Sequence, residues 1–348
     1  MEWIPELKPP AGGLAAEGFK RLLGRPRLDP LTVLVRETAQ NSWDARLDNQ
    51  RQVGFQLDGW ELNRDEIQAL RRDVFNKAGK AVGSGLAKEL KSKKLLGLYV
   101  VDRNTKGLGG PTQADEESPE RVYDWVDFVL NVGEANKEAH TGGTYGFGKT
   151  IAYVVSKANA VVIHSRTRHK GRLVSRLIAC AIGEKFTVSG KLYTGRHWWG
   201  ISKNGVPHPV IGTDADEIAA AIGMPEFRPK ETGTNLLVVA PDFGGRDPIQ
   251  GMRFIAESVT WHLWPKMMAW EGQRGMDISV SWNGEAIGID KRNEIEARLQ
   301  AVAAIPDQPE VHLRPNKLVT YKHVAMIMAT AQRLGVTKIG IVGNEQFL

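Results

Sequence analysis

Three polar side chains with helical spacing are the most informative feature of this sequence. Glu37, Asn41 and Asp44 follow the pattern E-x-x-x-N-x-x-D, and Ala45 comes next. At about 100° per residue, the three positions project within a sector of roughly 60° on one helix face. A carboxamide oxygen can hold a divalent cation, and a nearby carboxylate can take a proton from water. The pattern is therefore suited to a metal ligand and a general base side by side.

The helix that must carry these residues is predicted over residues 30–48. Asp29 is suited to the N-cap position, and Pro30 fits the first helical turn. The side opposite the polar sector predicts a buried face, since it is apolar or small: Leu31, Leu34, Val35, Thr38, Ser42 and Ala45. Ordinary exposed helices also carry such polar faces. The interpretation of this helix as a catalytic or metal-binding site therefore depends on motifs elsewhere in the chain.

The composition is that of an ordinary globular protein. With 348 residues, 42% hydrophobic and 25% charged, the chain has room for two domains. The single cysteine, Cys180, excludes an intramolecular disulfide and a cysteine-rich metal site, and it fits a cytoplasmic location. The N-terminus shows no signal-peptide pattern and no run reaches about 18 apolar residues, so we expect no membrane association.

The charge distribution leaves nucleic acid open as a partner. The net charge is +6, and basic residues cluster at Lys88–Lys94 and Arg166–Arg172. Such clusters can contact nucleic-acid phosphates. The 40 acidic residues interspersed along the chain favour the simpler interpretation of a solvated face.

The rest of the chain mixes predicted helices and strands. Residues 1–28 are rich in Pro and Gly and predict an irregular arm. Predicted helices cover 62–93, 249–270, 291–303 and 320–334. Predicted strands cover 95–101, 160–167, 172–182, 234–240 and 337–342. Asn283-Gly284 predicts a hairpin turn, and the linker 271–275 is the expected domain boundary.

Two Gly-rich segments carry further chemistry. Asp102 ends the strand pattern LLGLYVV and precedes a loop containing Gly107 and Gly109. The segment GGTYGFGKT, over Gly142–Thr150, opens a predicted helix. Glycines let the backbone approach a ligand closely, and a helix N-terminus favours anions. Both features are typical of phosphate-binding sites.

The second segment also satisfies the P-loop pattern G-x-x-x-x-G-K-[ST] at Gly143–Thr150. A P-loop should directly follow a buried strand, whereas residues 134–140 are polar. The best Walker-B strand, Leu236–Ala240 followed by Asp242, lies far downstream. A P-loop NTPase or kinase therefore remains an alternative interpretation.

Taken in order, these motifs resemble the GHKL ATPase superfamily, which includes the gyrase B subunit, the large heat-shock chaperones, MutL, MORC proteins and histidine kinases. The resemblance covers roughly residues 28–270; residues 142–156 are similar to the gyrase lid, and Gly233-Thr234 to its G-T box. It implies an α+β Bergerat-type fold, a two-layer α/β sandwich whose mixed sheet has helices on one face. The expected organisation is an arm over 1–28, an ATP-binding domain over 29–272, and a smaller α/β transducer-like region over 276–348 that could continue in a longer protein.

The resemblance also implies roles for individual residues. Glu37 matches the general base, Asn41 the Mg²⁺ ligand, and Asp44 a supporting polar residue. Asp102 matches the aspartate that accepts a hydrogen bond from the adenine amino group, with Thr234 beside it. The remaining expected nucleotide-binding residues are Asn104, Gly107, Gly109, Gly143, Gly146, Phe147, Gly148, Lys149 and Thr150.

Two positions depart from the family pattern. The family's adenine loop is D-x-G-x-G, but Asn104 stands where the first glycine is expected, and the glycines come later. Asn is the residue that best tolerates the left-handed backbone after glycine. Lys149 is extra relative to the gyrase pattern. In gyrase-like and MutL-like proteins a transducer lysine reaches the γ-phosphate, and Lys317 and Lys338 are the candidates for it here.

The implied activity is Mg²⁺-dependent ATP binding and slow ATP hydrolysis that drives a conformational switch or the formation of a homodimer. Histidine kinases carry a different residue where Glu37 stands, which favours hydrolysis. The MORC-like and MutL-like comparison extends the expectation to DNA transactions or phage defence, with DNA or a protein as partner. Three alternatives stay open: a P-loop NTPase or kinase, a nucleotide-binding interaction module without turnover, and a nucleic-acid-binding protein with an incidental Gly-rich loop.

Overall fold

The computed structural model describes residues 1–10, 28–47, 52–77, 84–131, 147–267, 275–289, 299–313 and 321–342. Its strands are β1 (Glu2–Leu7), β2 (Gly54–Glu61), β3 (Leu96–Arg103), β4 (Ala160–His169), β5 (Arg172–Ile182), β6 (Phe186–Val188), β7 (Lys191–Lys203), β8 (Val206–His208), β9 (Val210–Ile211), β10 (Gly233–Val239), β11 (Asp277–Trp282), β12 (Glu285–Ile287), β13 (Val311–Leu313) and β14 (Ile339–Ile341). Its α-helices are α2 (Pro30–Asp44), α3 (Arg64–Ala69), α4 (Ser84–Glu89), α5 (Phe147–Val155), α6 (Thr213–Ala221), α7 (Pro248–Met267) and α9 (Tyr321–Arg333). Single π-helical turns cover Leu70–Val74 and Val126–Leu130.

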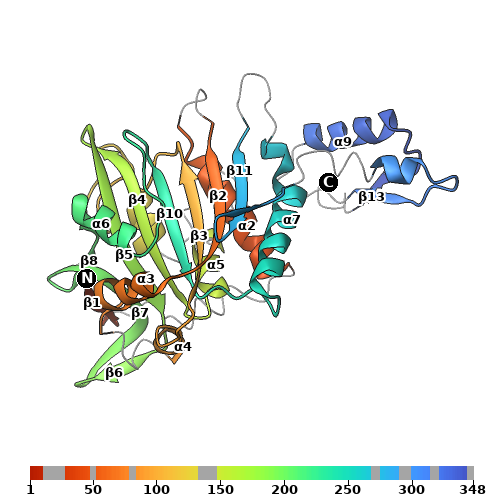
Figure 1. The fold of residues 1–348 in the computed structure, drawn as a ribbon. Coiled ribbons are helices and arrows are strands. Elements are labelled where there is room, and N and C mark those ends of the chain that lie inside the picture. Colours follow the sequence, from red (N-terminus) through yellow and green to blue (C-terminus); the bar gives the residue numbers. More distant parts are fainter. Residues whose placement is uncertain are drawn as a thin grey trace.

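A large mixed sheet organises the main body (Figure 1). Among the described residues it is 12-stranded, in the order β1-β7-β5-β4-β10-β3-β2-β11-β12, with β6 and β8 beside β7 and β9 beside β5. The strand pairs are antiparallel except β2 with β11, which are parallel. The predicted α+β class with a mixed sheet is therefore confirmed.

Helices cover both faces of this sheet. The longer helices α2, α5 and α7 share one hydrophobic core with Leu98 and Val100 of β3. The shorter helices α3, α4 and α6 share a second core with Tyr99 and Val101 of the same strand. Because β3 is apolar on both sides, each of its faces must be buried. The family resemblance implied helices on one face only, whereas the structure also places α3, α4 and α6 on the second face.

Helix α2 begins as its sequence dictates. The Asp29 carboxylate accepts a hydrogen bond from the backbone N–H of Leu31 at 2.9 Å, and Pro30 occupies the first turn. The buried face is the predicted one, except that Ala45 is half-buried. The hydroxyls of Thr38 and Ser42 bond to helix carbonyls four residues earlier, which satisfies them inside the core. The helix ends at Asp44, earlier than predicted.

Part of the N-terminal segment differs from the expected irregular arm. Residues Glu2–Leu7 form β1 and pair antiparallel with β7 at one edge of the sheet. Pro5 is tolerated there because an edge strand need not donate on its outer side. Residues 11–27 of the expected arm lie outside the described residues.

The C-terminal region matches most of the expected elements. Asn283 and Gly284 both have positive φ, 49° and 81°, as the predicted two-residue hairpin turn requires. The strands of this hairpin, β11 and β12, extend the large sheet beside β2, and the position of the domain boundary stays a prediction. Helix α9 and strand β14 occur where predicted. Most of the helix expected at 291–303 lies outside the described residues.

A small parallel pair, β13 and β14, packs with α9 at the C-terminal end. Figure 1 shows this unit extending beyond α7, away from the large sheet. Of the helices in the described part of the chain, none combines the length and apolar character needed to cross a membrane.

Candidate functional site

The polar face of α2 is open, as the spacing predicted. Glu37 is half-buried, whereas Asn41 and Asp44 are exposed. Asp44 accepts a hydrogen bond from the Gln40 side chain at 2.8 Å. Within the described residues, the carboxamide of Asn41 makes no side-chain hydrogen bond, so its oxygen is available to a ligand.

This donor set fits Mg²⁺ better than a protein-only metal cage. In the described part of the chain, no group of three or more His, Cys, Asp or Glu residues could hold a metal ion. Mg²⁺ commonly takes one or two protein oxygens and completes its shell with water and substrate phosphates. The single free carboxamide of Asn41 suits that mode of binding.

The carboxylate of Glu37 is electrostatically prepared to accept a proton. Burial raises its pKa above the usual range of a glutamate, and the neighbouring Arg36 guanidinium opposes this rise. Burial in turn lowers the pKa of Arg36. A general base works best when its pKa lies closer to the working pH than that of a free carboxylate. The direction of this pKa change is the one that a general base needs, and the role of Glu37 stays a prediction.

Asp102 lies where three structural elements meet, on the α2 face of the sheet. Its carboxylate accepts hydrogen bonds from the backbone N–H of Thr234 at 3.0 Å, from the Ser42 hydroxyl of α2 at 3.4 Å, and from the Thr105 hydroxyl. Strand pairing places Thr234 directly opposite Asp102. Burial raises the pKa of Asp102, and these hydrogen bonds together with the Arg103 charge partly offset the rise.

The Asp102 cluster joins three of the predicted motifs. Ser42 belongs to the E-x-x-x-N-x-x-D helix, Asp102 begins the Gly-rich loop, and Thr234 belongs to the G-T pair. A further hydroxyl, Ser165 of β4, lies 3.1 Å from that of Thr234 and donates to the carbonyl of Gly233 at 3.0 Å. Residues more than 190 positions apart in the sequence thus meet at one end of the sheet.

The backbone conformation of the loop after Asp102 accounts for its departure from the D-x-G-x-G pattern. Asn104 has a φ of 60°, so it adopts the left-handed conformation that its place in the pattern predicted. Gly107, with a φ of 66°, is buried, and a Cβ there would lie 2.3 Å from the carbonyl oxygen of Arg166. The requirement for glycine at Gly107 comes from this contact with β4. A direct ligand contact of Gly107 stays a prediction.

The lid segment is only partly described. Gly143 and Gly146 lie outside the described residues, as do the side chains of Phe147 and Lys149. Helix α5 begins at Phe147, directly after the Gly-rich segment, so Gly148, Lys149 and the buried Thr150 occupy its first turn. A helix at this point is expected for both the lid and the P-loop interpretations.

Helix α5 packs against α2. The end of α5 is fixed beside the start of α2, because Val155 accepts from the N–H of Asp242 while Arg246 pairs with Asp29 at 3.0 Å. At about 1.5 Å per residue, nine residues span roughly 12 Å. From this arrangement we infer that the N-terminus of α5, with its positive dipole end, lies towards the middle of α2.

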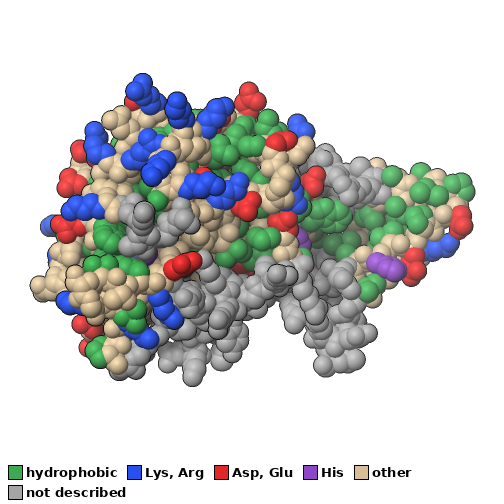
Figure 2. Space-filling model, turned by 90° about the horizontal axis from the view of Figure 1, so that it is seen from below, with side chains coloured by type: hydrophobic (Ala, Val, Ile, Leu, Met, Phe, Trp, Pro, Cys, Tyr) green, Lys and Arg blue, Asp and Glu red, His purple; other side chains and the backbone are tan. Residues whose placement is uncertain are grey.

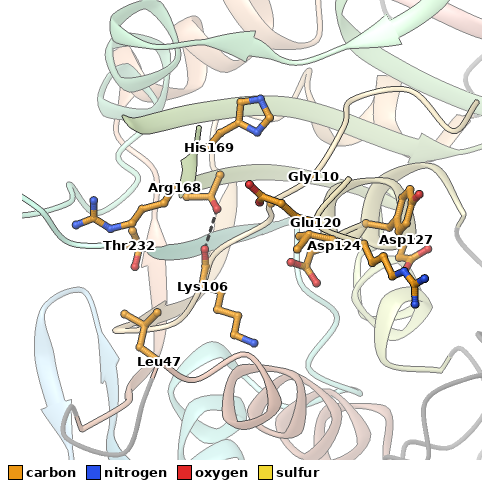
Figure 3. A pocket seen from close by; sticks show the side chains of 14 residues that line it. Leu47, Lys106, Gly110, Glu120, Asp124, Asp127, Arg168, His169 and Thr232 are labelled. Atoms are coloured by element: carbon orange, nitrogen blue, oxygen red, sulfur yellow. Dashed lines mark hydrogen bonds between the residues drawn. The ribbon is translucent and has the colours of Figure 1, made fainter. Parts of the chain in front are cut away.

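A cavity of about 730 Å³ lies beside the loop that follows Asp102, and its lining includes neither Asp102 nor the hydroxyls bonded to it. It is lined by the chain after α2, the Asp102 loop, residues 120–127, the end of β4 and Thr232. Figure 3 shows Glu120, Asp124 and Asp127 on one side and Leu47, Arg168 and Thr232 on the other. Thr167 lies two positions after Ser165 on β4, so the cavity opens on the same face of the sheet as the cluster.

Gly109 is the predicted site residue that lines this cavity. A Cβ at Gly109 would lie 3.1 Å from a Val122 side-chain carbon. Burial raises the pKa of Asp124, the positive charge of Lys106 opposes the rise, and Asp127 adds to it. The cavity is thus polar, with both charge signs on its wall, and its volume is in the range of small-molecule sites.

The role of either candidate lysine at the γ-phosphate stays a prediction. Lys338 is exposed in the β13–β14 unit and pairs with Asp307 at 2.8 Å, and Lys317 lies outside the described residues. A lysine that the sequence had not indicated, Lys266 of α7, lies 5.0 Å above the Trp43 ring of α2. Burial lowers the pKa of Lys266 to about 8, and the nearby Asp44 opposes the decrease.

The predicted basic cluster at Arg166–Arg172 is only partly available at the surface. Arg166 pairs with Asp216 at 2.9 Å and donates to the Ser175 hydroxyl, so its guanidinium is committed within the protein. Arg168 and Lys170 remain exposed. On the face seen in Figure 2, Lys and Arg side chains are interspersed with Asp and Glu, as expected for a solvated surface.

Sequence reasoning missed the hydroxyls that surround Asp102. Thr105 and Ser165 carry no pattern of their own, although Thr105 lies only three residues after the aspartate. Ser42 was correctly placed on the buried face of α2, but its partner could not be inferred. The cavity residues Lys106 and Asp124 likewise had no signal in the sequence.

Comparisons with known proteins give limited information. A family model described as Biopolymer transport protein ExbD/TolR matches residues 270–346, well under half of the chain, and so does not assign the chain to that family. No curated protein matches. Among solved structures, the ATPase region of Saccharomyces cerevisiae topoisomerase II bound to ICRF-187 is similar at 13% identity and a TM-score of 0.37. That match covers 78% of this chain, which spans about half (53%) of the solved one. At this level of similarity, function has to be argued from the residues of the chain itself.

Proposed function

We propose that this protein binds ATP together with Mg²⁺ and hydrolyses the nucleotide slowly. The observation that carries the proposal is the Asp102 cluster, in which Ser42 of α2 and Thr234 of β10 both bond to one partly buried carboxylate. This contact holds the buried face of α2 against Asp102, so the C-terminal half of the helix lies beside that carboxylate on the same side of the sheet. The neighbouring cavity of about 730 Å³ supplies room for a base and sugar.

The positions of Asn41 and Glu37 along α2 suit a nucleotide lying from Asp102 towards Glu37. Asp102 would accept a hydrogen bond from an exocyclic amino group of the base. The phosphates would lie near Asn41 and the N-terminus of α5, because the N–H groups of a first helical turn favour anions. About 10 Å separates residues at the end and the middle of such a helix, comparable with the length of a nucleotide.

The chemistry assigned to the protein itself is limited to binding, orientation and proton transfer. Asn41 would hold Mg²⁺ through its free carboxamide oxygen, and a bound Mg²⁺ supplies charge neutralisation at the phosphates. Glu37 would orient a water molecule and accept its proton at the carboxylate. Catalysis of this kind rests on positioning and electrostatic stabilisation.

The first expected result separates this site from a P-loop. Asn41→Ala should abolish Mg²⁺-dependent ATP hydrolysis, because the protein's metal ligand is lost, whereas Lys149→Ala should reduce it by less than about tenfold. Steady-state phosphate release at several Mg²⁺ concentrations measures both. Gln68→Ala, an exposed position on α3 away from the site, is the control. Loss of activity in Lys149→Ala with normal activity in Asn41→Ala would instead support a P-loop enzyme.

The second expected result concerns pH. Glu37 must be ionised to act as a base, so its raised pKa predicts that activity falls on the acid side above the usual glutamate range. Arg36 lowers that pKa, and removing its charge should raise it further. Arg36→Gln should therefore shift the acid limb of the kcat–pH profile to higher pH.

The control for this pH measurement is Arg253→Gln, which removes an exposed charge from α7. It should leave the acid limb where it is. An acid limb that stays fixed or moves downward in Arg36→Gln would contradict the assignment of Glu37 as the titrating base.

The wider role is also a proposal. A slow ATPase of this design would act as a conformational or dimerisation switch, with a homodimer forming on ATP binding and DNA or a protein as the client. We place it in the cytoplasm, where the free, buried thiol of Cys180 is stable. The size of the ATP-bound and nucleotide-free protein in solution tests the dimer directly.

A further inference from the structure

The sheet carries a second polar cluster on the face opposite Asp102. Phe227 is buried between two guanidinium groups, that of Arg103 at 4.3 Å and that of Arg166 at 4.9 Å from the ring centre. The imidazole ring of His164 also packs against Phe227 in an edge-type contact, with 5.1 Å between the two ring centres. A phenyl ring held by two cations and an imidazole is a rigid arrangement, because each partner limits the motion of the others.

This arrangement is linked by sequence to the Asp102 cluster. Side chains alternate between the two faces of a strand. Arg103 follows Asp102 on β3, Arg166 follows Ser165 on β4, and Asn235 follows Thr234 on β10. Each strand that supplies a group to the Asp102 cluster thus supplies the next residue to the opposite face.

Hydrogen bonds connect these residues across the three strands. Arg103 donates to the carbonyl of Asp102 at 2.8 Å and to the side-chain oxygen of Asn235 at 2.7 Å. The amide of Asn235 donates to the carbonyl of Pro225 at 2.7 Å, and Arg103 pairs with Glu231 at 3.2 Å. The ends of β3 and β10 and the segment 225–231 are therefore held as one unit.

A second anchor lies on α6. Asp216 accepts from Arg166 at 2.9 Å and contacts a ring nitrogen of His164, also at 2.9 Å. Burial raises the pKa of Asp216, but hydrogen bonds from His164 and Ser175 and the Arg166 charge outweigh it and hold the pKa at about 2. Asp216 is therefore charged near neutral pH and keeps Arg166 in place beside Phe227.

The segment that carries Phe227 leads directly into the proposed site. Thr232 accepts from the N–H of Asn104 at 3.1 Å and donates its hydroxyl to the carbonyl of Thr105 at 2.6 Å. Next, Gly233 passes so close to Asp102 that a Cβ would lie 2.2 Å from the Asp102 carbonyl oxygen. A small movement of residues 225–232 would thus displace both Thr234 and the Asp102 loop.

We propose that Phe227, Arg103 and Arg166 are positioning residues that hold the Asp102–Thr234 end of the nucleotide site from the far face of the sheet. The inference rests on the proposed function, because it assigns the base-recognition end of that site. Among the described residues, no hydrogen bond, ion pair or ring contact joins Phe227, Arg103 or Arg166 to α2, so the network should affect nucleotide affinity and leave the step at Glu37 unchanged.

The test replaces the ring and measures two quantities. Phe227→Leu should increase hydrogen exchange at the N–H groups of Thr234 and Asn104 at least about tenfold, while the middle of β10 keeps its protection. It should also raise the Kd for Mg²⁺ and a non-hydrolysable ATP analogue by about tenfold, with kcat at saturating ATP within about twofold. Phe227→Tyr, which keeps the ring, should restore both values.

The matched control is Phe254→Leu, because Phe254 also packs under a guanidinium, that of Arg246 at 3.9 Å, but on α7. It should change neither quantity. If Phe227→Leu fails to fold, Arg166→Lys keeps the charge, loses the planar contact and carries the same expectations. Unchanged exchange at Thr234, or raised exchange with an unchanged Kd, would overturn the proposal. The exchange measurement needs no nucleotide, so a wild-type protein that binds no ATP would refute the proposed function separately.

Discussion

Glu37→Gln should lower ATP hydrolysis by at least about 100-fold and leave the affinity for the nucleotide within about threefold. Glutamine keeps the size of the side chain and its hydrogen-bonding reach but cannot accept a proton from water. General-base catalysis by a positioned carboxylate commonly contributes factors of about 10² to 10⁴. Single-turnover phosphate release measures the chemical step, and titration with a non-hydrolysable analogue measures binding.

The environment of Glu37 makes this variant informative. The side chain is half-buried, and its carboxylate accepts no hydrogen bond from another described residue, so the substitution should not disturb folding. Glu257→Gln, at an exposed position on α7, is the matched control and should hydrolyse ATP normally. Substantial hydrolysis in Glu37→Gln would remove Glu37 from the role of base, even if ATP still binds.

Asp102→Asn should weaken nucleotide binding by roughly 10- to 100-fold. The carboxylate accepts from three donors, Thr234, Thr105 and Ser42, and keeps acceptor capacity for a base amino group. In asparagine an N–H₂ group replaces one of the two oxygens, so the acceptor for the base amino group is lost and that amino group would be left without a partner on binding. A buried polar group that loses its partner costs about 1–3 kcal/mol, which corresponds to the expected loss of affinity.

The fold should survive this second substitution. Because burial raises the pKa of Asp102, its charged form is costly inside the protein, and the neutral amide removes that cost. The unfolding temperature of Asp102→Asn should therefore stay close to that of the wild type. Asp214→Asn, an exposed acid on α6, provides the control for binding. Unchanged affinity in Asp102→Asn would exclude this carboxylate from base recognition.

The sequence was most predictive where local rules apply. The spacing of Glu37, Asn41 and Asp44, with the cap at Asp29, predicts both the exposed and the buried side of α2, because helix geometry depends on near neighbours. The Asn283-Gly284 turn and the strands around 100 and 236 follow from equally local patterns. The left-handed conformation of Asn104 was likewise predicted from its local sequence.

Contacts between residues far apart in the sequence could not be predicted from such local rules. Nothing in the sequence around Phe227 indicates that two arginines from β3 and β4 hold its ring, because cation–ring contacts depend on which strands pair. The strands β1 and β7 were missed for a related reason, since each is stabilised by the partner that covers its edge or face. The hydroxyls of Ser42 and Thr105 gain their role only through the buried carboxylate they share.

Equilibrium binding of a non-hydrolysable ATP analogue in the presence of Mg²⁺ tests the central claim most directly. Calorimetric titration of the wild type, Glu37→Gln and Asp102→Asn should show saturable binding of one nucleotide per chain to the first two and strongly weakened binding to the third. Absence of binding to the wild type, or equal affinity of the wild type and Asp102→Asn, would contradict an ATP site built around Asp102 and the polar face of α2.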